Sequence, residues 1–360
     1  MAEPLRIAYT LEQCWHRVPG GTAVAALEVL RELRELRDLS IIGVAGTHAE
    51  PPPPPWAPTI TVAAVPHAGA RLYASWLFAG RPPVEQATGP LDVVHATTII
   101  PCPSAAPLVV TVHDLAFLHE PAHFTRWGHL VFRRSLSVIR RRAVAVLCSS
   151  QATADDCEAA GIGADRIRIV PLGVRPPAPV GPDEIARVRA VHELPERYVL
   201  FVGTVEPRKN LARLAEAVAR SGLGLPLVAA GPPGWGEGAA PGYPVRFLGF
   251  VPNPDLAALY AGATVVGYPS LREGFGLPVL EAFAAGVPVV TSRGTATEEA
   301  AGGAAVLVDP LSVDDIARGL VDAVGDADAL RTAGLARARA CSWEATARRT
   351  AEVYREVAAR

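Results

Sequence analysis

Lysine is almost absent from this chain of 360 residues, which holds one lysine against 33 arginines. The excess of arginine and alanine indicates a compositional bias that replaces lysine by arginine wherever the exchange is tolerated. The remaining lysine, Lys209, is therefore a candidate for a position where the two cations are not interchangeable. The sequence leaves open the alternative that Lys209 survives by chance on a solvated surface.

Cysteine is also scarce, and its distribution excludes two kinds of site. The five cysteines are odd in number and no two form a C-x-x-C pair, so we expect reduced thiols and no zinc site. The N-terminal residues lack the charged start and long apolar core of a signal peptide. No uninterrupted apolar stretch reaches the ~20 residues that a membrane-spanning helix needs. We therefore expect a cytoplasmic protein.

Neither sign of charge dominates the chain as a whole. A net charge of −2 argues against a general nucleic-acid-binding protein. No Asp-x-Asp motif follows a strand, as a metal–diphosphate site would require. The two acidic pairs, Asp155–Asp156 and Asp314–Asp315, are expected at helix starts, where they serve the helix dipole. The sequence therefore predicts no metal site.

Short apolar runs alternate with helical patterns in the first half of the chain. Strands are predicted at 5–10, 39–46, 92–97, 107–114 and 143–150, and helices at 21–36, 122–142 and 150–160. This alternation predicts a parallel sheet with helices on both faces. The proline run 51–58 cannot form regular structure and is expected to be an exposed loop.

A segment rich in proline and glycine, 174–183, interrupts this pattern, which then restarts. Strands are predicted at 198–204, 226–231, 245–250, 263–270, 287–292 and 304–310, and helices at 210–219, from about 277, and at 312–324, 327–340 and 343–358. A length of 360 residues and a hydrophobic content of 50% suit two domains, each with its own core.

We therefore predict an α/β protein of two doubly wound, Rossmann-like domains that face each other across a cleft. The first domain covers 1–173, a Pro-rich interdomain linker covers 174–197, and the second domain covers 198–342. A C-terminal helix at 343–360 is long enough to return to the first domain. Ligands of open α/β sheets bind at the carboxyl ends of the strands, so the chemistry is expected in the cleft, gated by its closure.

The motif TVEPRKN opens the second domain and points to an anion. Gly203 permits a sharp exit from the preceding strand. Arg208 and Lys209 stand near a helix start, where the dipole disfavours cations and free backbone N–H groups favour an anion. The pair is therefore suited to a phosphate, or better a diphosphate. A solvated pair of surface cations is the alternative.

The segment LREGFGLPVLEAF places two glutamates, Glu273 and Glu281, eight positions apart around a Gly-Phe-Gly turn. Gly274 and Gly276 allow the backbone to approach a ligand closely. Pro278 suits the first turn of a helix, which places Glu281 about one turn inside it. Carboxylates at the mouth of a cleft accept hydrogen bonds from the vicinal hydroxyls of sugars and riboses. The alternative is that Glu281 caps nearby backbone and Glu273 is solvated.

These motifs resemble those of the retaining glycosyltransferases of family 4, which have the two-domain GT-B fold. The resemblance rests on PSLREGFGLPVLEAFAAGVPVVTS and on FVGTVEPRKNL before it. The segments VTVHDL and IVPLGV in the first half, and SWEATA near the end, are similar to the family as well. The resemblance covers essentially the whole chain and is strongest after residue 198.

For the second domain, the resemblance implies the site of a nucleotide-sugar donor. Arg208 and Lys209 would hold the diphosphate, Glu281 the ribose hydroxyls, and Glu273 would contact the transferred sugar. The backbone of Gly274, Phe275, Gly276 and Leu277 would lie against the phosphates and the sugar, and the segment around Phe250 and Val251 by the base.

For the first domain, which would bind the acceptor, the resemblance implies two further elements. Gly20 and Gly21 would form a loop that approaches the diphosphate. Thr22–Val24 stand where the family often has an arginine, so that contact is not expected here. His113 would face the donor sugar and join Arg208, Lys209 and Glu273 in catalysis. Histidines at strand ends also commonly bond only a backbone carbonyl, and the sequence does not decide between these roles.

The implied activity is that of a retaining hexosyltransferase. It would move a sugar from a nucleoside diphosphate donor, its co-substrate, to the hydroxyl of a glycan, a lipid-linked or a small-molecule acceptor, without a metal or other cofactor. The look of the first domain mildly favours mannose carried on GDP. A GT-B sugar-nucleotide epimerase and a nucleotide-sugar-binding protein without transfer activity are the alternatives.

Two further segments of the first domain stand out. Residues 124–144 hold six arginines, which form either a solvated helix face or a surface for a phosphorylated or lipid-linked acceptor at an anionic membrane. The second interpretation would place the protein at the periphery of the inner membrane face. Trp15, His16 and Arg17, just before the glycine pair, are weaker candidates for acceptor recognition.

Overall fold

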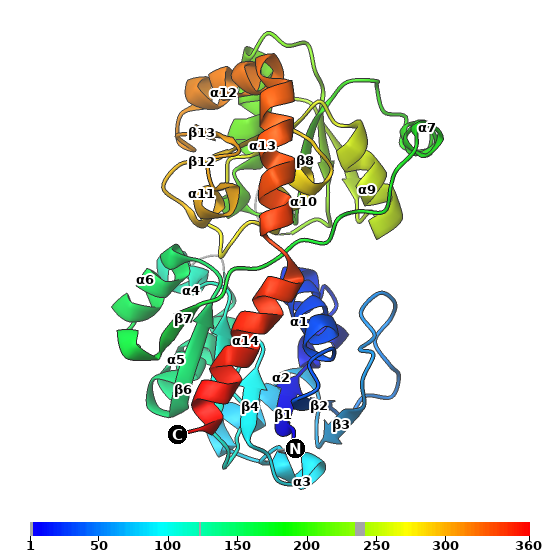
Figure 1. The fold of residues 1–360 in the computed structure, drawn as a ribbon. Helices are drawn as coiled ribbons and strands as arrows, with labels where there is room; N and C mark the ends of the chain where they lie inside the picture. Colours follow the sequence, from blue (N-terminus) through cyan, green and yellow to red (C-terminus); the bar gives the residue numbers. More distant parts are fainter. Residues whose placement is uncertain (1–2, 122–123, 235–241) are drawn as a thin grey trace. The chain divides into compact units, whose positions relative to one another are not determined.

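A computed structural model describes residues 3–121, 124–234 and 242–360 of the chain (Figure 1). The chain divides into two compact units. Unit 1 contains Met1–Leu172 together with Trp343–Arg360, and unit 2 contains Gly173–Ser342. Each unit is an α/β structure built on one parallel sheet.

Unit 1 contains a seven-stranded parallel sheet in the order β3-β2-β1-β4-β5-β6-β7. The strands are β1 (Leu5–Thr10), β2 (Leu39–Gly46), β3 (Val62–Val65), β4 (Val93–Ala96), β5 (Leu108–Val112), β6 (Ala143–Cys148) and β7 (Ile167–Ile169). The helical segments are η1 (Glu12–Trp15), α1 (Gly20–Leu33), α2 (Gly69–Ala74), η2 (Ser75–Ala79), α3 (Glu85–Thr88), α4 (Ala116–His119), α5 (Arg126–Arg142), α6 (Gln151–Ala159), η4 (Ala164–Arg166) and α14 (Trp343–Ala358).

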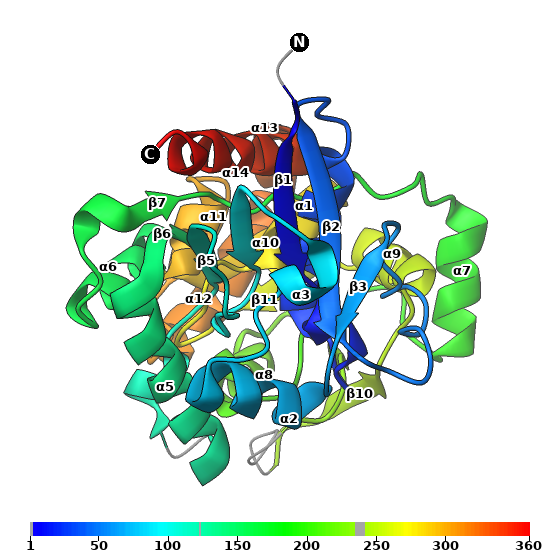
Figure 2. The same cartoon turned by 90° about the horizontal axis from the view of Figure 1, so that it is seen from below.

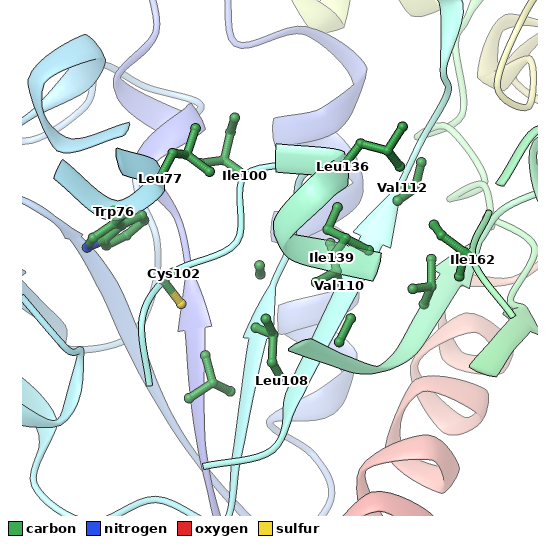
Figure 3. Close-up of a cluster of buried hydrophobic side chains, with 14 of the residues drawn as sticks. Trp76, Leu77, Ile100, Cys102, Leu108, Val110, Val112, Leu136, Ile139 and Ile162 are labelled. Atoms are coloured by element: carbon green, nitrogen blue, oxygen red, sulfur yellow. The ribbon is translucent and has the colours of Figure 1, made fainter. Parts of the chain in front are cut away.

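Both faces of this sheet are buried, because successive side chains of a strand point to opposite faces. On one face Leu108, Val110 and Val112 of β5 pack in a cluster with residues of α5 and η2 (Figure 3). On the other face Tyr9 donates a hydrogen bond to the Ala26 carbonyl of α1 at 2.9 Å. The near-continuous apolar strands of this unit therefore follow from burial on both sides.

The last helix of the chain, α14, belongs to unit 1 and packs on α1 (Figure 1). Its buried Tyr354 hydroxyl lies 2.6 Å from Nδ1 of His95 on β4, and Nε2 of His95 lies 2.7 Å from the Thr111 hydroxyl. Burial lowers the pKa of His95 to about 3, so this histidine is neutral. A polar chain thus joins α14 to the middle of the sheet.

Unit 2 contains a six-stranded parallel sheet in the order β10-β9-β8-β11-β12-β13. The strands are β8 (Val199–Val202), β9 (Leu227–Ala230), β10 (Val245–Gly249), β11 (Val265–Tyr268), β12 (Val289–Ser292) and β13 (Val306–Val308). The helical segments are α7 (Pro182–Val191), η5 (Pro207–Lys209), α8 (Leu211–Arg220), α9 (Asn253–Gly262), α10 (Leu277–Ala284), α11 (Ala296–Ala301), α12 (Val313–Gly325) and α13 (Ala327–Ala340).

The structure differs from the sequence prediction in several places. The segment 174–197, expected to be a linker, contains helix α7, whose first turn carries Pro182, Asp183 and Glu184, and α7 packs on α9 of unit 2. Asp155–Asp156 do not open a helix, because α6 begins earlier, at Gln151. Residues 122–123 of the helix predicted from 122 lie outside the described residues, and α5 begins at Arg126.

In both sheets the chain reverses its direction of winding beside the first strand. In unit 2, β9 and β10 lie on one side of β8 and the later strands on the other, so the reversal falls between β8 and β11. In unit 1 it falls between β1 and β4. Ligands of open α/β sheets bind at the carboxyl ends of strands at such points. Within the described residues, no helix is long and apolar enough to cross a membrane.

Candidate active site

The carboxyl ends of β8 and β11 in unit 2 hold most of the residues predicted for the donor site. The chain leaves β8 at Gly203 and forms the short helical turn η5, which carries Arg208 and Lys209. The loop after β11 carries Glu273, and α10 follows it. Because β8 and β11 are neighbours in the sheet, their two loops lie next to each other at the switch point.

Glu273 binds both cations of the η5 turn. Its Oε1 accepts a hydrogen bond from Nζ of Lys209 at 2.8 Å, and its Oε2 accepts one from Nη1 of Arg208 at 2.8 Å. Arg208 also binds Oε2 of Glu206 through its Nε at 2.7 Å. Two cations and two carboxylates therefore form one network, the Glu273 cluster. The alternatives of a solvated Glu273 and of a solvated cation pair are both wrong for this structure.

Lys209 is 7% exposed, so it does not lie on a solvated surface. Its Nζ lies 2.6 Å from the Tyr268 hydroxyl and 5.1 Å from the centre of that ring. An ammonium group has three donor hydrogens, and Tyr268 and Glu273 take two of them. In the described part of the chain, no hydrogen-bond acceptor for the third hydrogen is present. The stem of Lys209 lies against Gly203, where a Cβ would stand 3.2 Å from Cδ of the lysine.

Asn210 fixes the η5 turn in place. It adopts a left-handed conformation with φ of 61°, which ends the turn just before α8 begins. Its side-chain amide donates to the carbonyls of Pro269 at 2.9 Å and Pro310 at 2.6 Å. The backbone N–H of Leu271 in turn donates to the carbonyl of Arg208 at 2.7 Å. The two loops of the site are thus joined through their backbones as well as through Glu273.

Electrostatics keep Glu273 ionised despite its position. Burial acts to raise the pKa of this carboxyl group, but the charges of Lys209 and Arg208 and the hydrogen bonds from Lys209 and Tyr268 outweigh that effect. The resulting pKa is about 2. The Tyr268 hydroxyl, which donates to Glu273 at 2.8 Å, has its own pKa raised by burial and by the same carboxylate.

Glu281 has a different environment on α10. Its Oε2 accepts a hydrogen bond from the Tyr260 hydroxyl of α9 at 2.8 Å, and no ion pair to Glu281 is present among the described residues. Burial raises the pKa of Glu281 above its ordinary value, and the bond from Tyr260 only partly opposes this. The alternative that Glu281 caps nearby backbone finds no support, because its partner is a side chain. The pKa values of the two glutamates are therefore shifted in opposite directions, down for Glu273 and up for Glu281.

The glycine turn between the glutamates leads into the start of α10. Gly276 has φ of 109°, and a Cβ there would stand 2.9 Å from Cγ2 of Thr297, so only glycine fits. Gly274 precedes it, and Phe275 is buried beside it. The helix then begins at Leu277, and no side chain caps its first turn. Its first backbone N–H groups are the kind of donors that bind phosphate.

Phe250 and Val251 follow β10 at the same edge of the sheet. Phe250 is 64% exposed, whereas Val251 is buried. An exposed aromatic ring in this loop offers a surface on which a planar base can stack. The ring follows the carboxyl end of β10, and ligands of open α/β sheets bind at the carboxyl ends of strands.

The predicted residues of unit 1 follow β1 and β5, at the carboxyl edge of its sheet. Gly20, with φ of 64°, and Gly21 form the start of α1, where no side-chain cap is present. His113 follows β5, and its Nε2 lies 3.1 Å from the Thr97 carbonyl, which is the backbone contact that the sequence left open. Burial lowers the pKa of His113, although the Thr97 carbonyl and the charge of Asp114 act in the opposite direction.

The loop after β1 holds another buried carboxylate, Glu12, which sequence analysis did not identify. Glu12 accepts hydrogen bonds from the backbone N–H groups of Gly46 at 2.7 Å and Gly69 at 2.5 Å, and lies 3.0 Å from Nε2 of His48. The ring of Trp15 stacks on His48 with 4.6 Å between ring centres. Glu12 thus joins the loop after β1 to the segments that follow β2 and β3.

Two tyrosines of the donor-side site were also missed. Tyr268 donates a hydrogen bond to Glu273, and Tyr260 donates one to Glu281. In the sequence, a tyrosine at the end of a strand or inside a helix has the pattern typical of a core residue. No signal in the sequence distinguishes them.

Within the described part of the chain, no group of three or more His, Cys, Asp or Glu side chains is arranged to hold a metal ion.

Models of glycosyltransferase families match both units of the chain. Residues 196–326 match the family model described as "Glycosyl transferases group 1", and residues 19–176 match the model described as "Glycosyltransferase Family 4". Together the two matches include every predicted site residue.

Two curated relatives illustrate the range of similarity. The O-antigen chain mannosyltransferase B of Escherichia coli is 33% identical over 267 residues, which cover 69% of this chain and 70% of that protein. The D-inositol 3-phosphate glycosyltransferase of a Nocardioides species is 36% identical over 211 residues, which cover 49% of this chain and 46% of that protein.

The crystal structure of HepE from Anabaena in complex with UDP-glucose has the same fold. It superimposes with a TM-score of 0.74 at 19% sequence identity, covering 98% of this chain and 100% of that chain. The predicted α/β, GT-B class with two Rossmann-like sheets is thereby confirmed. Taken with the paired family models and the E. coli relative, these findings show that the chain is a glycosyltransferase and belongs to glycosyltransferase family 4.

Proposed function

We propose that the protein is a retaining, metal-independent mannosyltransferase that uses GDP-mannose. The observation that carries the proposal is the Glu273 cluster, in which Arg208 and Lys209 are held at the carboxyl ends of β8 and β11. The cluster lies in the loop that leads into the uncapped start of α10. Fixed cations and helix-terminal N–H groups are the elements that stabilise a departing diphosphate.

The reaction breaks the bond between the anomeric carbon of the donor sugar and the diphosphate, and forms a bond to an acceptor hydroxyl oxygen. Arg208 and Lys209 stabilise the charge that develops on the leaving group, and the acceptor proton leaves with that group. Glu273 orients the cations and accepts a hydrogen bond from the sugar, whereas Glu281 binds the ribose hydroxyls. No protein nucleophile is required when the acceptor attacks from the face that the diphosphate leaves, which retains the anomeric configuration.

The donor identity rests on relatives rather than on the site. The E. coli relative that aligns over most of its length is named a mannosyltransferase, and further relatives carry the same activity in their names. The HepE structure contains UDP-glucose, so the fold itself accommodates a different donor. We favour GDP-mannose on the strength of the sequence relatives, since the structural neighbour is only 19% identical.

A thermal-shift screen with GDP-, UDP-, ADP- and dTDP-sugars tests the donor, because a ligand that binds the native state raises its melting temperature. We expect GDP-mannose to give the largest shift. A shift with UDP-sugars alone would overturn the proposed donor. Incubation with radiolabelled GDP-mannose and an acceptor then tests transfer, and the anomeric configuration of the product tests retention.

Three controls separate the alternatives. Activity that survives EDTA supports catalysis by the two cations, whereas loss on EDTA treatment with recovery on added magnesium or manganese would reveal a metal site. Conversion of the donor to its epimer without acceptor would favour an epimerase. A donor-induced thermal shift with neither transfer nor donor hydrolysis would favour a binding protein without transfer activity. The acceptor is proposed only as a hydroxyl-bearing glycan, lipid-linked or small molecule.

A further inference from the structure

Helix α5 carries an unbalanced positive charge on unit 1. Its six arginines are Arg126, Arg133, Arg134, Arg140, Arg141 and Arg142. The sequence contains no aspartate or glutamate between Glu120 and Asp155. Among the described residues none of the six forms an ion pair, whereas arginines elsewhere do, such as Arg168 with Glu356 at 2.6 Å and Arg318 with Asp315 at 2.8 Å.

The same helix exposes large apolar side chains beside these cations. Trp127 and Leu130 of α5 are 48% and 49% exposed, and Phe78 of the neighbouring turn η2 is 46% exposed. The rings of Phe78 and Trp127 stack with 6.1 Å between centres, and the Arg134 guanidinium lies 5.9 Å from the Phe78 centre. Figure 2 shows α5 next to the helical segment that continues α2. Exposed apolar side chains that gather in one place beside charged residues are typical of an interaction surface.

The cationic and apolar residues share one side of the helix. Arg126, Trp127, Leu130, Arg133 and Arg134 follow the spacing that places residues on a single helical face. With Phe78 they define the α5 surface. The opposite side, with Leu136 and Ile139, packs into the core of unit 1 (Figure 3).

We propose that the α5 surface docks the protein on an anionic lipid membrane. Aromatic and leucine side chains flanked by arginines are the composition with which a helix lies in the interface between head groups and acyl chains. Anionic head groups would supply the negative charge that no described side chain supplies. The inference goes beyond sugar transfer, and it stands or falls independently of the donor.

The charge pattern disfavours other occupants of this surface. A symmetric contact with a second copy would bring one arginine-rich face against another, which like-charge repulsion opposes. A nucleic acid would complement the charge, but it would leave Phe78 and Leu130 without an apolar environment. An acidic lipid surface satisfies both the cations and the apolar side chains.

Co-sedimentation of the full-length protein with lipid vesicles tests the proposal. We expect binding to vesicles of phosphatidylcholine mixed with phosphatidylglycerol, weak binding to phosphatidylcholine alone, and loss of binding as ionic strength rises. The double variant Arg126→Gln/Arg133→Gln should lower the partition coefficient on the order of 30-fold, the effect of two basic residues near an anionic surface. Trp127→Ala/Leu130→Ala should lower it as well, with all arginines in place.

A matched control removes two arginines elsewhere. Arg318→Gln/Arg348→Gln makes the same change of net charge on the exposed faces of α12 and α14, and should bind vesicles like the unaltered protein. Melting temperatures establish that each variant is folded. The proposal is overturned if the protein does not bind anionic vesicles, or if the control pair weakens binding as much as the α5 pair. Self-association through α5 in place of vesicle binding, seen by sedimentation velocity, would also overturn it.

Discussion

The two groups of cations in this protein differ in what surrounds them. Arg208 and Lys209 are held by Glu206 and Glu273 at 2.7–2.8 Å in a largely buried network. The arginines of α5 are mostly exposed and, in the described part of the chain, have no carboxylate partner. The sequence does not show which of these cations have carboxylate partners. The difference arises from Glu273, which lies 64 positions from Lys209 and reaches it only through the fold.

This difference has opposite consequences for binding. Carboxylate partners fix Arg208 and Lys209 in position, so a diphosphate meets cations that need no reorganisation. The same partners compete with the ligand, because two cations and two carboxylates balance in formal charge. Unpaired cations on α5 attract anions from farther away, but they are screened over about 8 Å at physiological ionic strength. The first arrangement suits a specific site and the second a broad anionic surface.

The largest effect is expected from replacing Lys209, the cation for which identity and not only charge should matter. Lys209→Ala should lower kcat about 10²–10³-fold, as does the loss of one preorganised donor to a developing charge. Lys209→Arg keeps the charge, yet a planar guanidinium does not fit between Glu273, the Tyr268 ring and Gly203. We expect at least a tenfold loss, or ~1.4 kcal/mol of barrier, in steady-state assays.

Stability must be measured alongside. Because Lys209 is buried and paired, Lys209→Ala also leaves Glu273 with one cation fewer, and a lower unfolding midpoint in urea is expected. The arginine variant is the sharper test because it preserves the charge balance. Near-normal transfer by a folded Lys209→Arg protein would mean that the lone lysine is an accident of composition.

The next effect separates the two glutamates. Glu281→Ala should weaken binding of the free nucleoside diphosphate as well as of the donor, by about 1.5–3 kcal/mol for a lost bond to a charged group. Glu273→Ala should spare the free diphosphate, because it removes a competitor for Arg208 and Lys209, and should mainly lower kcat. Calorimetric titration with the nucleoside diphosphate checks both variants. Equal losses of affinity would contradict this division of roles.

The parts of this site that could be predicted from sequence are those encoded in contiguous motifs. The strand–turn–helix context of TVEPRKN and the Glu-x7-Glu pattern located Arg208, Lys209, Glu273 and Glu281, and the alternating pattern located most strands. The sequence could not show that Glu273 would neutralise Arg208 and Lys209, since that contact spans loops after two different strands. Tyr260 and Tyr268 were missed because a tyrosine that orients a carboxylate has the same local pattern as one in a core.

Short elements were missed for a related reason. Strand β7 has the sequence IRI and strand β3 the sequence VAAV, and neither forms the run of large apolar residues that revealed the equally short β13 (VLV). Helix α7 follows a segment rich in proline and glycine, a composition that is typical of a linker. Proline is nevertheless common in the first turn of a helix, which is where Pro182 lies. The local composition therefore correctly indicated irregular chain before Pro182, but it did not reveal helix α7.

A smaller effect follows from the pKa values of the two glutamates. Burial raises the pKa of Glu281, so this group takes up a proton as the pH falls, while Glu273, with a pKa of about 2, stays ionised. The ribose hydroxyls bind best to the ionised form of Glu281. Donor affinity should therefore be highest above the raised pKa of Glu281 and should fall as the pH drops through that pKa. Titrations with an intact sugar nucleotide, whose phosphates do not change charge in this range, measure the profile. Glu281→Gln should flatten it and Glu273→Gln should not; the reverse result would contradict the assignment.

The smallest effect is expected from exchanging arginine for lysine on α5, and it completes the comparison. Arg126→Lys/Arg133→Lys keeps both charges on solvent-exposed positions, so the unfolding free energy should change by no more than about 0.5 kcal/mol. A membrane surface attracts basic residues through net charge, so vesicle binding should also stay close to that of the unaltered protein. The corresponding exchange in the Glu273 cluster, Lys209→Arg, should be costly because the cation there is enclosed on several sides. If the α5 lysine variant instead loses vesicle binding as severely as Arg126→Gln/Arg133→Gln, the guanidinium groups of α5 make specific contacts with the membrane. The α5 surface and the Glu273 cluster would then differ only in the partner that their cations bind.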